Sequence, residues 1–403
     1  MPGMHWWISV ALSLGLASCH EKTEDGAPDV DDPYADPGIA DHLSDPAAAA
    51  WYIDAANGND DNDGRTPDTA WQHLAKIHSI VLAPGDVVRL ARGAVWSGES
   101  ILFDNGDGGT ADQPVIVEPY GTGAAPALRA PRTLWDPDQK TTAVTFGAGS
   151  AYIAVLGLSV SGTEEFSGFG MSDDTHHLVI AGNDIQGCGT GIDVRGTDQK
   201  ILSNTISDSG FDGRGSGVAI GFIGSRLEMA WNTIRNSRVE KDGRMDGGAF
   251  EYYGRYFDDD NVERYDLSDD IAIHHNVLDD NLMFIEAYGN ATNMVIAHNL
   301  YMNSGPSALI FHLDDCEHET WTHECTYQVR LENNTFVTER GSDAGGWGIV
   351  GLLVDWDHPA DPAKSSVLVR NNIFVTDYRI MAFINPLGDN LVHDHNLFFF
   401  EGE

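Results

Sequence analysis

Positive charge is scarce in this 403-residue chain. It carries 23 Lys and Arg residues against 62 Asp and Glu residues, a formal net charge of −39. Proteins that bind nucleic acid present basic surfaces to the phosphates, so this deficit argues against nucleic acid as a partner. The same charge repels polyanionic ligands unless Ca²⁺ bridges them.

The apolar run near the start of the chain is short. Residues 6–16 fall well below the roughly 20 apolar residues that a membrane-spanning helix needs, so residues 1–19 are expected to be a signal peptide. The run ends in Leu16-Ala17-Ser18-Cys19, which resembles a bacterial lipobox. That resemblance implies cleavage before Cys19, a lipid on its thiol, and a protein anchored at the bacterial outer membrane or cell surface. Residues 1–5 lack the usual Lys or Arg, and the alternative is an ordinary secretory signal with a chance cysteine.

Large apolar residues are nearly absent from the next segment, residues 20–50, which is rich in Asp, Pro and Ala. Such a segment cannot bury enough surface to offset its ordering entropy, so we expect a disordered acidic tether. The remainder, residues 51–403, is expected to form one domain.

Cysteine is also rare, with four in the chain. Cys19 is assigned to the lipid, and Cys188 is expected to be buried. Cys316 and Cys325 frame a polar loop, and in an oxidising compartment a disulfide between them is the first interpretation. The alternative is a metal site, because His318 and His323 lie between the two cysteines.

What the chain does have is a repeat. Short alternating strands are each followed by an Asn and a second short strand, and this plan recurs at Asn183, Asn204, Asn232, Asn276, Asn299, Asn334, Asn372 and Asn396. Asn tolerates the left-handed conformation of a tight corner, and stacked Asn side chains can hydrogen-bond along a column. A propeller or a leucine-rich repeat would show other signatures. The repeat therefore predicts a parallel solenoid, whose coils share one core.

This Asn-turn repeat, over roughly residues 140–403, resembles that of the pectate-lyase-like superfamily. The resemblance implies an all-β, right-handed parallel β-helix. The preceding segment resembles the opening of secreted β-helix carbohydrate-active enzymes, and residues 70–80 suit an amphipathic helix that would cap the first coil. Asn59, Asp61, Asp63 and Gly64 match the start of a Ca²⁺ loop, but Ala70 stands where its Glu should be, which favours a simple turn.

With the coils aligned on their Asn residues, the next strand of each coil can be compared. Apolar residues alternate along it and point inward, so the residue between them is expected to face outward. The predicted outward column is Asp193, Gly221, Glu251, Glu286, His312, Asp355 and Asn385. Two glutamates on neighbouring strands would repel, which suits acid–base or nucleophilic chemistry. The alternative is a solvated face on an acidic protein.

The longest insertions flank this column and supply aromatic residues. Sugar contacts are expected from Asp193, Tyr253, Tyr288, Trp347 and Asn385. Asp258, Asp259 and Asp260 are a candidate Ca²⁺ site, the one cofactor that we expect.

These features predict a monomeric enzyme acting on a polysaccharide or oligosaccharide. The favoured reaction is glycoside hydrolysis by Glu251 and Glu286, with His312 and Asp355 shaping the site. The alternatives are a Ca²⁺-dependent lyase acting on uronates, with His312 as its base, and a glycan-binding protein without catalysis.

Overall fold

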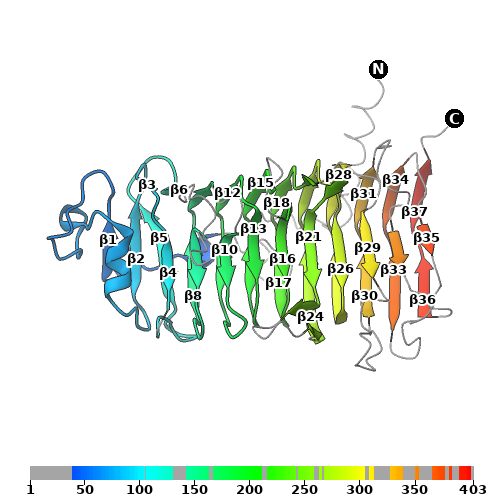
Figure 1. Cartoon of the computed structure of the whole chain (residues 1–403), viewed down its shortest axis with the longest axis horizontal. Helices are drawn as coiled ribbons and strands as arrows, with labels where there is room; N and C mark the ends of the chain where they lie inside the picture. Colours follow the sequence, from blue (N-terminus) through cyan, green and yellow to red (C-terminus); the bar gives the residue numbers. More distant parts are fainter. Residues whose placement is uncertain are drawn as a thin grey trace, which may run out of the picture. The chain divides into compact units, whose positions relative to one another are not determined.

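A computed structural model gives the architecture of the chain (Figure 1). It describes residues 39–104, 106–129, 142–162, 167–210, 216–241, 244–257, 263–265, 267–304, 308–312, 327–338, 350–353, 365–376, 381–383 and 390–400. Within these ranges the protein is a right-handed parallel β-helix, as the resemblance of the Asn repeat to that of the pectate-lyase-like superfamily implied.

Three parallel sheets form the walls of the helix, with one strand per coil in each. Sheet A consists of β1 (Ala50–Ile53), β2 (Val87–Ala91), β5 (Val115–Tyr120), β8 (Ile153–Leu156), β11 (Val179–Ala181), β14 (Lys200–Leu202), β17 (Leu227–Ala230), β24 (Leu267–His274), β27 (Asn290–Ala297), β30 (Tyr327–Glu332), β33 (Ser366–Arg370) and β36 (Leu391–Asp394). Sheet B consists of β3 (Val95–Ser97), β6 (Ala127–Arg129), β9 (Ser159–Ser161), β12 (Asp184–Gln186), β15 (Thr205–Ser207), β18 (Thr233–Arg235), β25 (Val277–Asp279), β28 (Leu300–Ser304), β31 (Thr335–Thr338), β34 (Ile373–Thr376) and β37 (Leu397–Phe400). Sheet C consists of β4 (Ile101–Phe103), β7 (Val144–Phe146), β10 (Ser167–Met171), β13 (Thr190–Val194), β16 (Val218–Phe222), β21 (Gly248–Tyr253), β26 (Ile285–Tyr288), β29 (Leu309–His312), β32 (Val350–Leu353) and β35 (Met381–Phe383).

The repeated asparagines form a continuous ladder inside the corner between sheets A and B. From Asn183 to Asn396, the Nδ2 of each donates to the Oδ1 of the next at 2.9–3.1 Å. The backbone N–H of each also donates to that same Oδ1. The predicted hydrogen-bonded column is therefore confirmed.

The left-handed residue of each corner is the one before the Asn, contrary to our expectation. Positive φ angles of 53–64° occur at Gly182, Ser203, Trp231, His275, His298, Asn333, Asn371 and His395. The ladder Asn must point its amide into the core, so its neighbour makes the bend and projects outward.

The first coil is capped by the segment around residues 71–79, but not by an α-helix over 70–80. A 3-10 helix, η3 (Leu74–Ser79), buries Leu74 and Ile77. The segment reaches the first strand of each sheet. Trp71 bridges to Ile53 in sheet A, Gln72 O accepts from Trp96 in sheet B, and His78 Nε2 accepts from Leu102 N–H in sheet C.

The expected disorder does not extend to the end of the acidic segment. A 3-10 helix, η1 (Ile39–His42), precedes residues that close over a buried ion pair between Arg89 and Glu118 (Nε–Oε1 3.0 Å). Ser44 Oγ donates to Glu118 at 2.5 Å, and the carbonyls of Asp45 and Pro46 accept from Arg89. Buried charges need such partners, which is why this stretch is ordered. Residues 1–38, with Cys19, lie outside the described part of the chain.

Residues 59–64 form a turn, in which Asn59 Oδ1 accepts from the N–H of Asp61, followed by the short 3-10 helix η2 (Pro67–Thr69). No helix in the described ranges is both long and apolar enough to cross a membrane.

Candidate functional site

The register of sheet C confirms the first four members of the predicted outward column. Asp193 in β13 pairs with Gly221 in β16, Gly221 pairs with Glu251 in β21, and Glu251 pairs with Glu286 in β26. The inward neighbours Phe250 and Ile285 are buried in the core, so the two glutamates face outward on adjacent strands. Adjacent strands lie about 4.8 Å apart, which brings the two carboxylates side by side.

The prediction that His312 continues this column is wrong. Glu286 pairs with Ile310, and His312 pairs instead with Tyr288, two residues further along β29. Beyond Ile310 the column passes to Gly351 and then to Ala382.

Several predicted site residues fall outside the described residues, and their roles stay predictions. They are Asp355, Asn385, Trp347, Asp258, Asp259, Asp260, Cys316 and Cys325. Gly351 and Ala382 hold the column positions on the last two described strands of sheet C. Cys188 is buried, as predicted.

A tyrosine follows each glutamate by two residues on the same strand and face. Tyr253 pairs with Tyr288 across β21 and β26, and the Tyr288 hydroxyl donates to Glu286 Oε1 at 2.7 Å. Burial raises the pKa of Tyr288 well above its ordinary range, and the charges of Glu286 and Glu251 raise it further. Burial likewise raises the pKa of Tyr253, with Glu251 and Asp193 adding to the effect. Both phenols therefore stay protonated and act as hydrogen-bond donors.

Gly221 makes room for the Tyr253 ring. A Cβ at position 221 would collide with Cε2 of that ring, so the glycine allows the ring to lie across the column between Asp193 and Glu251. The ring therefore lies over the backbone at Gly221. The predicted contact of Tyr253 with a sugar stays a prediction.

Arg195 lies beside Asp193, directly after β13, the first of the strands that carry these residues. Arg195, two residues after Asp193, holds Asp193 Oδ2 with its Nε at 3.3 Å and Asp173 Oδ1 with its Nη1 at 3.0 Å. We call Asp193, Tyr253, Glu251, Glu286 and Tyr288, with Gly221 beneath the Tyr253 ring, the sheet C row.

Two antiparallel hairpins flank the strand that carries Glu251. The pair β19 (Val239–Lys241) and β20 (Arg244–Asp246) directly precedes β21, and the pair β22 (Arg255–Phe257) and β23 (Glu263–Tyr265) follows it. Both ends of β21 thus carry extra structure, as the long insertions in the sequence predicted. Loops on a rigid scaffold are where binding sites form.

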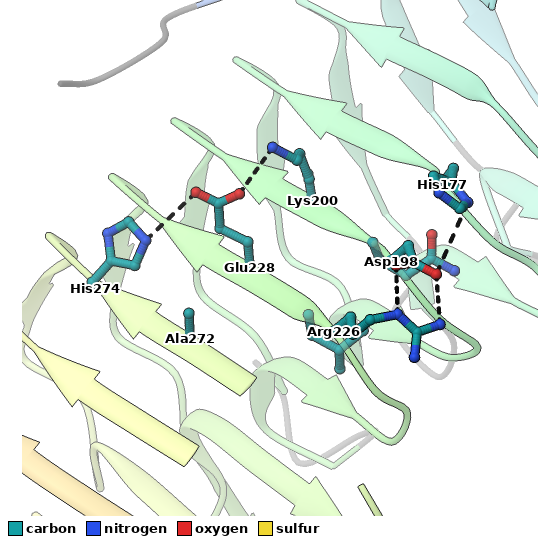
Figure 2. Close-up of a pocket in the computed structure, with 9 residues that line it drawn as sticks. His177, Asp198, Lys200, Arg226, Glu228, Ala272 and His274 are labelled. Atoms are coloured by element: carbon teal, nitrogen blue, oxygen red, sulfur yellow. Dashed lines mark hydrogen bonds and ion pairs between the residues drawn. The ribbon is translucent and has the colours of Figure 1, made fainter. Parts of the chain in front are cut away.

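A second polar cluster, which the sequence reasoning missed, lies in a depression on the outer face of sheet A (Figure 2). Glu228 lies between Lys200 (Nζ–Oε2 3.1 Å) and His274 (Nε2–Oε1 3.5 Å), and the three come from β14, β17 and β24. Beside them Arg226 holds Asp198 in a two-pronged ion pair. The hydrogen bond to His274 lowers the pKa of Glu228 to about 2, against a desolvation effect that raises it. Because these charges compensate one another across the strands, we interpret the cluster as a structural ladder.

The two clusters differ in what they can do chemically. In sheet C two carboxylates stand together with phenol donors, and Arg195 is held by two aspartates at one end. Such a set can exchange protons with, or attack, a polar ligand. In the described ranges no group of three or more His, Cys, Asp or Glu side chains could hold a metal ion.

Comparison with known proteins shows similarity that is mostly one of fold. No family model matches the chain. A stretch of 77 residues, 19% of the chain, is 31% identical to lacto-N-biosidase of Bifidobacterium longum subsp. longum, of which it spans 5%.

Solved structures resemble the chain over most of its length. The complex of XylC with xylose has a TM-score of 0.50 at 10% identity, covering 88% of this chain and 86% of that one. Pectate lyase Pel9A has a TM-score of 0.47 at 12% identity, covering 86% and 79%. The lacto-N-biosidase of glycoside hydrolase family 136 from Eubacterium ramulus has a TM-score of 0.45 at 15% identity, covering 87% and 68%. This likeness is one of fold, the right-handed parallel β-helix.

Proposed function

We propose that this protein is a carbohydrate-active enzyme, and specifically a glycoside hydrolase that acts along the outer face of sheet C. The observation that carries the proposal is the pairing of Glu251 with Glu286 on adjacent parallel strands. A strand spacing of about 4.8 Å is close to the roughly 5–5.5 Å between the two carboxyl groups of a retaining glycosidase. The 77-residue similarity to lacto-N-biosidase is consistent with this reaction class.

The surroundings of the two glutamates suggest how they divide the work. The hydrogen bond from Tyr288 fixes one oxygen of Glu286 and so orients the other, which suits a nucleophile that attacks the anomeric carbon. Glu251 would then protonate the leaving oxygen and later activate the water that releases the product. Tyr253, held across Gly221, would support Glu251 from the same face.

The test compares Glu251→Gln and Glu286→Gln with a matched control, Glu228→Gln in the sheet A cluster. Each protein is incubated with neutral and uronate polysaccharides, with and without chelator, while reducing ends and ultraviolet absorbance are followed. We expect both sheet C variants to lose roughly 1,000-fold or more in kcat with unchanged circular dichroism, because each removes a group that acts in the transition state. The Glu228 variant should keep its activity.

Three results would contradict the proposal. Full activity in either sheet C variant would remove that glutamate from the mechanism. An unsaturated, ultraviolet-absorbing product that requires Ca²⁺ would indicate β-elimination. Glycan binding without new reducing ends would indicate a binding protein.

We further propose that the protein is exported and held at the bacterial envelope through a lipid on Cys19. Partition of the full chain into detergent, and its loss in Cys19→Ser, would support the anchor. Partition into the aqueous phase by both proteins would favour the ordinary secretory signal.

A further inference from the structure

We infer that the sheet C row takes an uncharged glycan, and that Asp173 and Asp193 set this selectivity by occupying Arg195. This inference rests on the proposed function, since it names the substrate class of the same site. Two observations support it: the acids and phenols that make up the row, and the contacts of Arg195 beside Asp193.

Arg195 is the group that would otherwise attract a uronate. Its guanidinium is held on two sides, by Asp193 at 3.3 Å and by Asp173 at 3.0 Å. Its side chain is 31% exposed, so it is near enough to the surface to meet a ligand. Two carboxylates already neutralise this guanidinium and occupy two edges of its planar set of donors. It therefore attracts a third carboxylate only weakly.

The remainder of the row offers acceptors and neutral donors. Glu251 and Glu286 supply carboxylate oxygens, and Tyr253 and Tyr288 supply protonated hydroxyls. The Tyr253 ring and hydroxyl lie over Gly221, which pairs with Asp193 on one side and Glu251 on the other, so the row is continuous from one acid to the next. Sugar hydroxyls both donate and accept, and they can pair with every member of such a set.

A uronate in the same position would meet like charge. A ligand carboxylate about 5 Å from one glutamate carboxylate is disfavoured by roughly 300-fold in affinity at an effective dielectric constant near 20. A bridging Ca²⁺ would relieve this repulsion, but the described side chains form no group of three that could hold one.

The experiment measures binding and not cleavage. The Glu286→Gln variant is titrated by calorimetry, in buffer without divalent cations, with neutral tetrasaccharides of glucose, galactose and mannose and with their C6-oxidised uronate counterparts. We expect the neutral tetrasaccharides to bind and each oxidised counterpart to bind about 300-fold more weakly than its neutral form. Equal or tighter binding of a uronate member would overturn the inference.

A second arm frees the arginine. In Asp173→Asn/Asp193→Asn on the same background, Arg195 loses both carboxylate partners, and uronate binding should rise by roughly tenfold. The matched control is Asp198→Asn, which frees Arg226 on sheet A in the same way and should change nothing. If the double variant does not fold, Asp173→Asn alone repeats the test at an exposed position. No gain, or the same gain in the control, would count against the role of the two aspartates.

The two proposals fail separately. Neutral glycans that bind but are not cleaved by the wild-type protein would refute the hydrolase and keep the substrate class. A uronate whose cleavage depends on Glu251 and Glu286 would refute the substrate class and keep the catalytic pair.

Discussion

Replacing one rung of the asparagine ladder tests what holds the coils together. Asn232 is fully buried and its side chain makes four hydrogen bonds. Its Nδ2 donates to Ile201 O at 2.9 Å and to Asn276 Oδ1 at 3.0 Å. Its Oδ1 accepts from the backbone N–H of Asn204 at 2.9 Å and from the Asn204 Nδ2 at 3.1 Å.

Asn232→Ala removes all four of these buried hydrogen bonds, including the one in which the N–H of Asn204 finds its acceptor. A buried hydrogen bond contributes about 1 kcal/mol net, so we expect the free energy of unfolding to fall by about 3–5 kcal/mol. Asn232→Asp keeps the shape and the acceptor but loses both donors and faces the Asn276 oxygen with a buried carboxylate. It should cost more than alanine.

The control is Asn396, at the C-terminal end of the ladder. Its side chain makes the same kinds of contact, donating to Val369 O at 2.9 Å and accepting from Asn372, but it is only partly buried. Water can replace lost partners there, so Asn396→Ala should cost about 1 kcal/mol or less.

The assay is urea denaturation followed by circular dichroism and by tryptophan fluorescence. Agreement of the two probes checks that the transition is cooperative, which solenoids do not always satisfy. The midpoint and the m-value then give the free-energy difference between each variant and the wild type. If Asn232→Ala and Asn396→Ala lose the same free energy, buried hydrogen bonding in the ladder does not stabilise the fold as argued.

Three smaller predictions concern single positions. The folded-state pKa of Glu228, lowered to about 2 by its hydrogen bond to His274, lies below that of the unfolded chain. The stability that the Glu228 carboxylate contributes is therefore fully present above about pH 5 and is lost as the pH falls towards 2. In urea titrations at a series of pH values, Glu228→Gln should remove about 1–2 kcal/mol of this acid-dependent stability, after allowance for solvent screening. Gly221→Ala should displace the Tyr253 ring and lower glycan cleavage by roughly tenfold, whereas unchanged kinetics would show that the ring position does not matter. Ser203→Gly, at a φ of 53°, should raise the free energy of unfolding by about 0.5–1 kcal/mol, and a loss of stability would contradict the left-handed corner.

The sequence predicted the solenoid because its corner residues repeat by type. It assigned the left-handed conformation to the asparagines, however, whereas Trp231 and His275 adopt it immediately before Asn232 and Asn276. The type of these preceding residues varies from coil to coil, so no repeat marks them. The physical constraint is on the asparagine, whose amide must point inward to reach the next rung.

The glutamate pair could be predicted because buried apolar residues bracket both acids. The same alternation failed for His312, since Ile310 and His312 stand two residues apart on β29 and a slip of two residues leaves the pattern unchanged. The side-chain contacts within the sheet C row could in principle have been predicted from the sequence. Glu286 and Tyr288 stand two residues apart on β26, and Arg195, which directly follows β13, stands two residues after Asp193; outward side chains at this spacing are neighbours.

The ladder also explains why a site should form on sheet C and not elsewhere. Two residues separate every sheet A strand from β8 onward from the following sheet B strand, as Gly182 and Asn183 do between β11 and β12, because a longer turn would move the amide off the ladder. Between sheets C and A the connection varies from the single Gly289 to the 14 residues 313–326. Variation in length is therefore confined to the two ends of the sheet C strands, and there hairpins can be added beside Glu251 without disturbing the stack. The Asn corner between sheets A and B thus confines insertions to the connections on either side of sheet C.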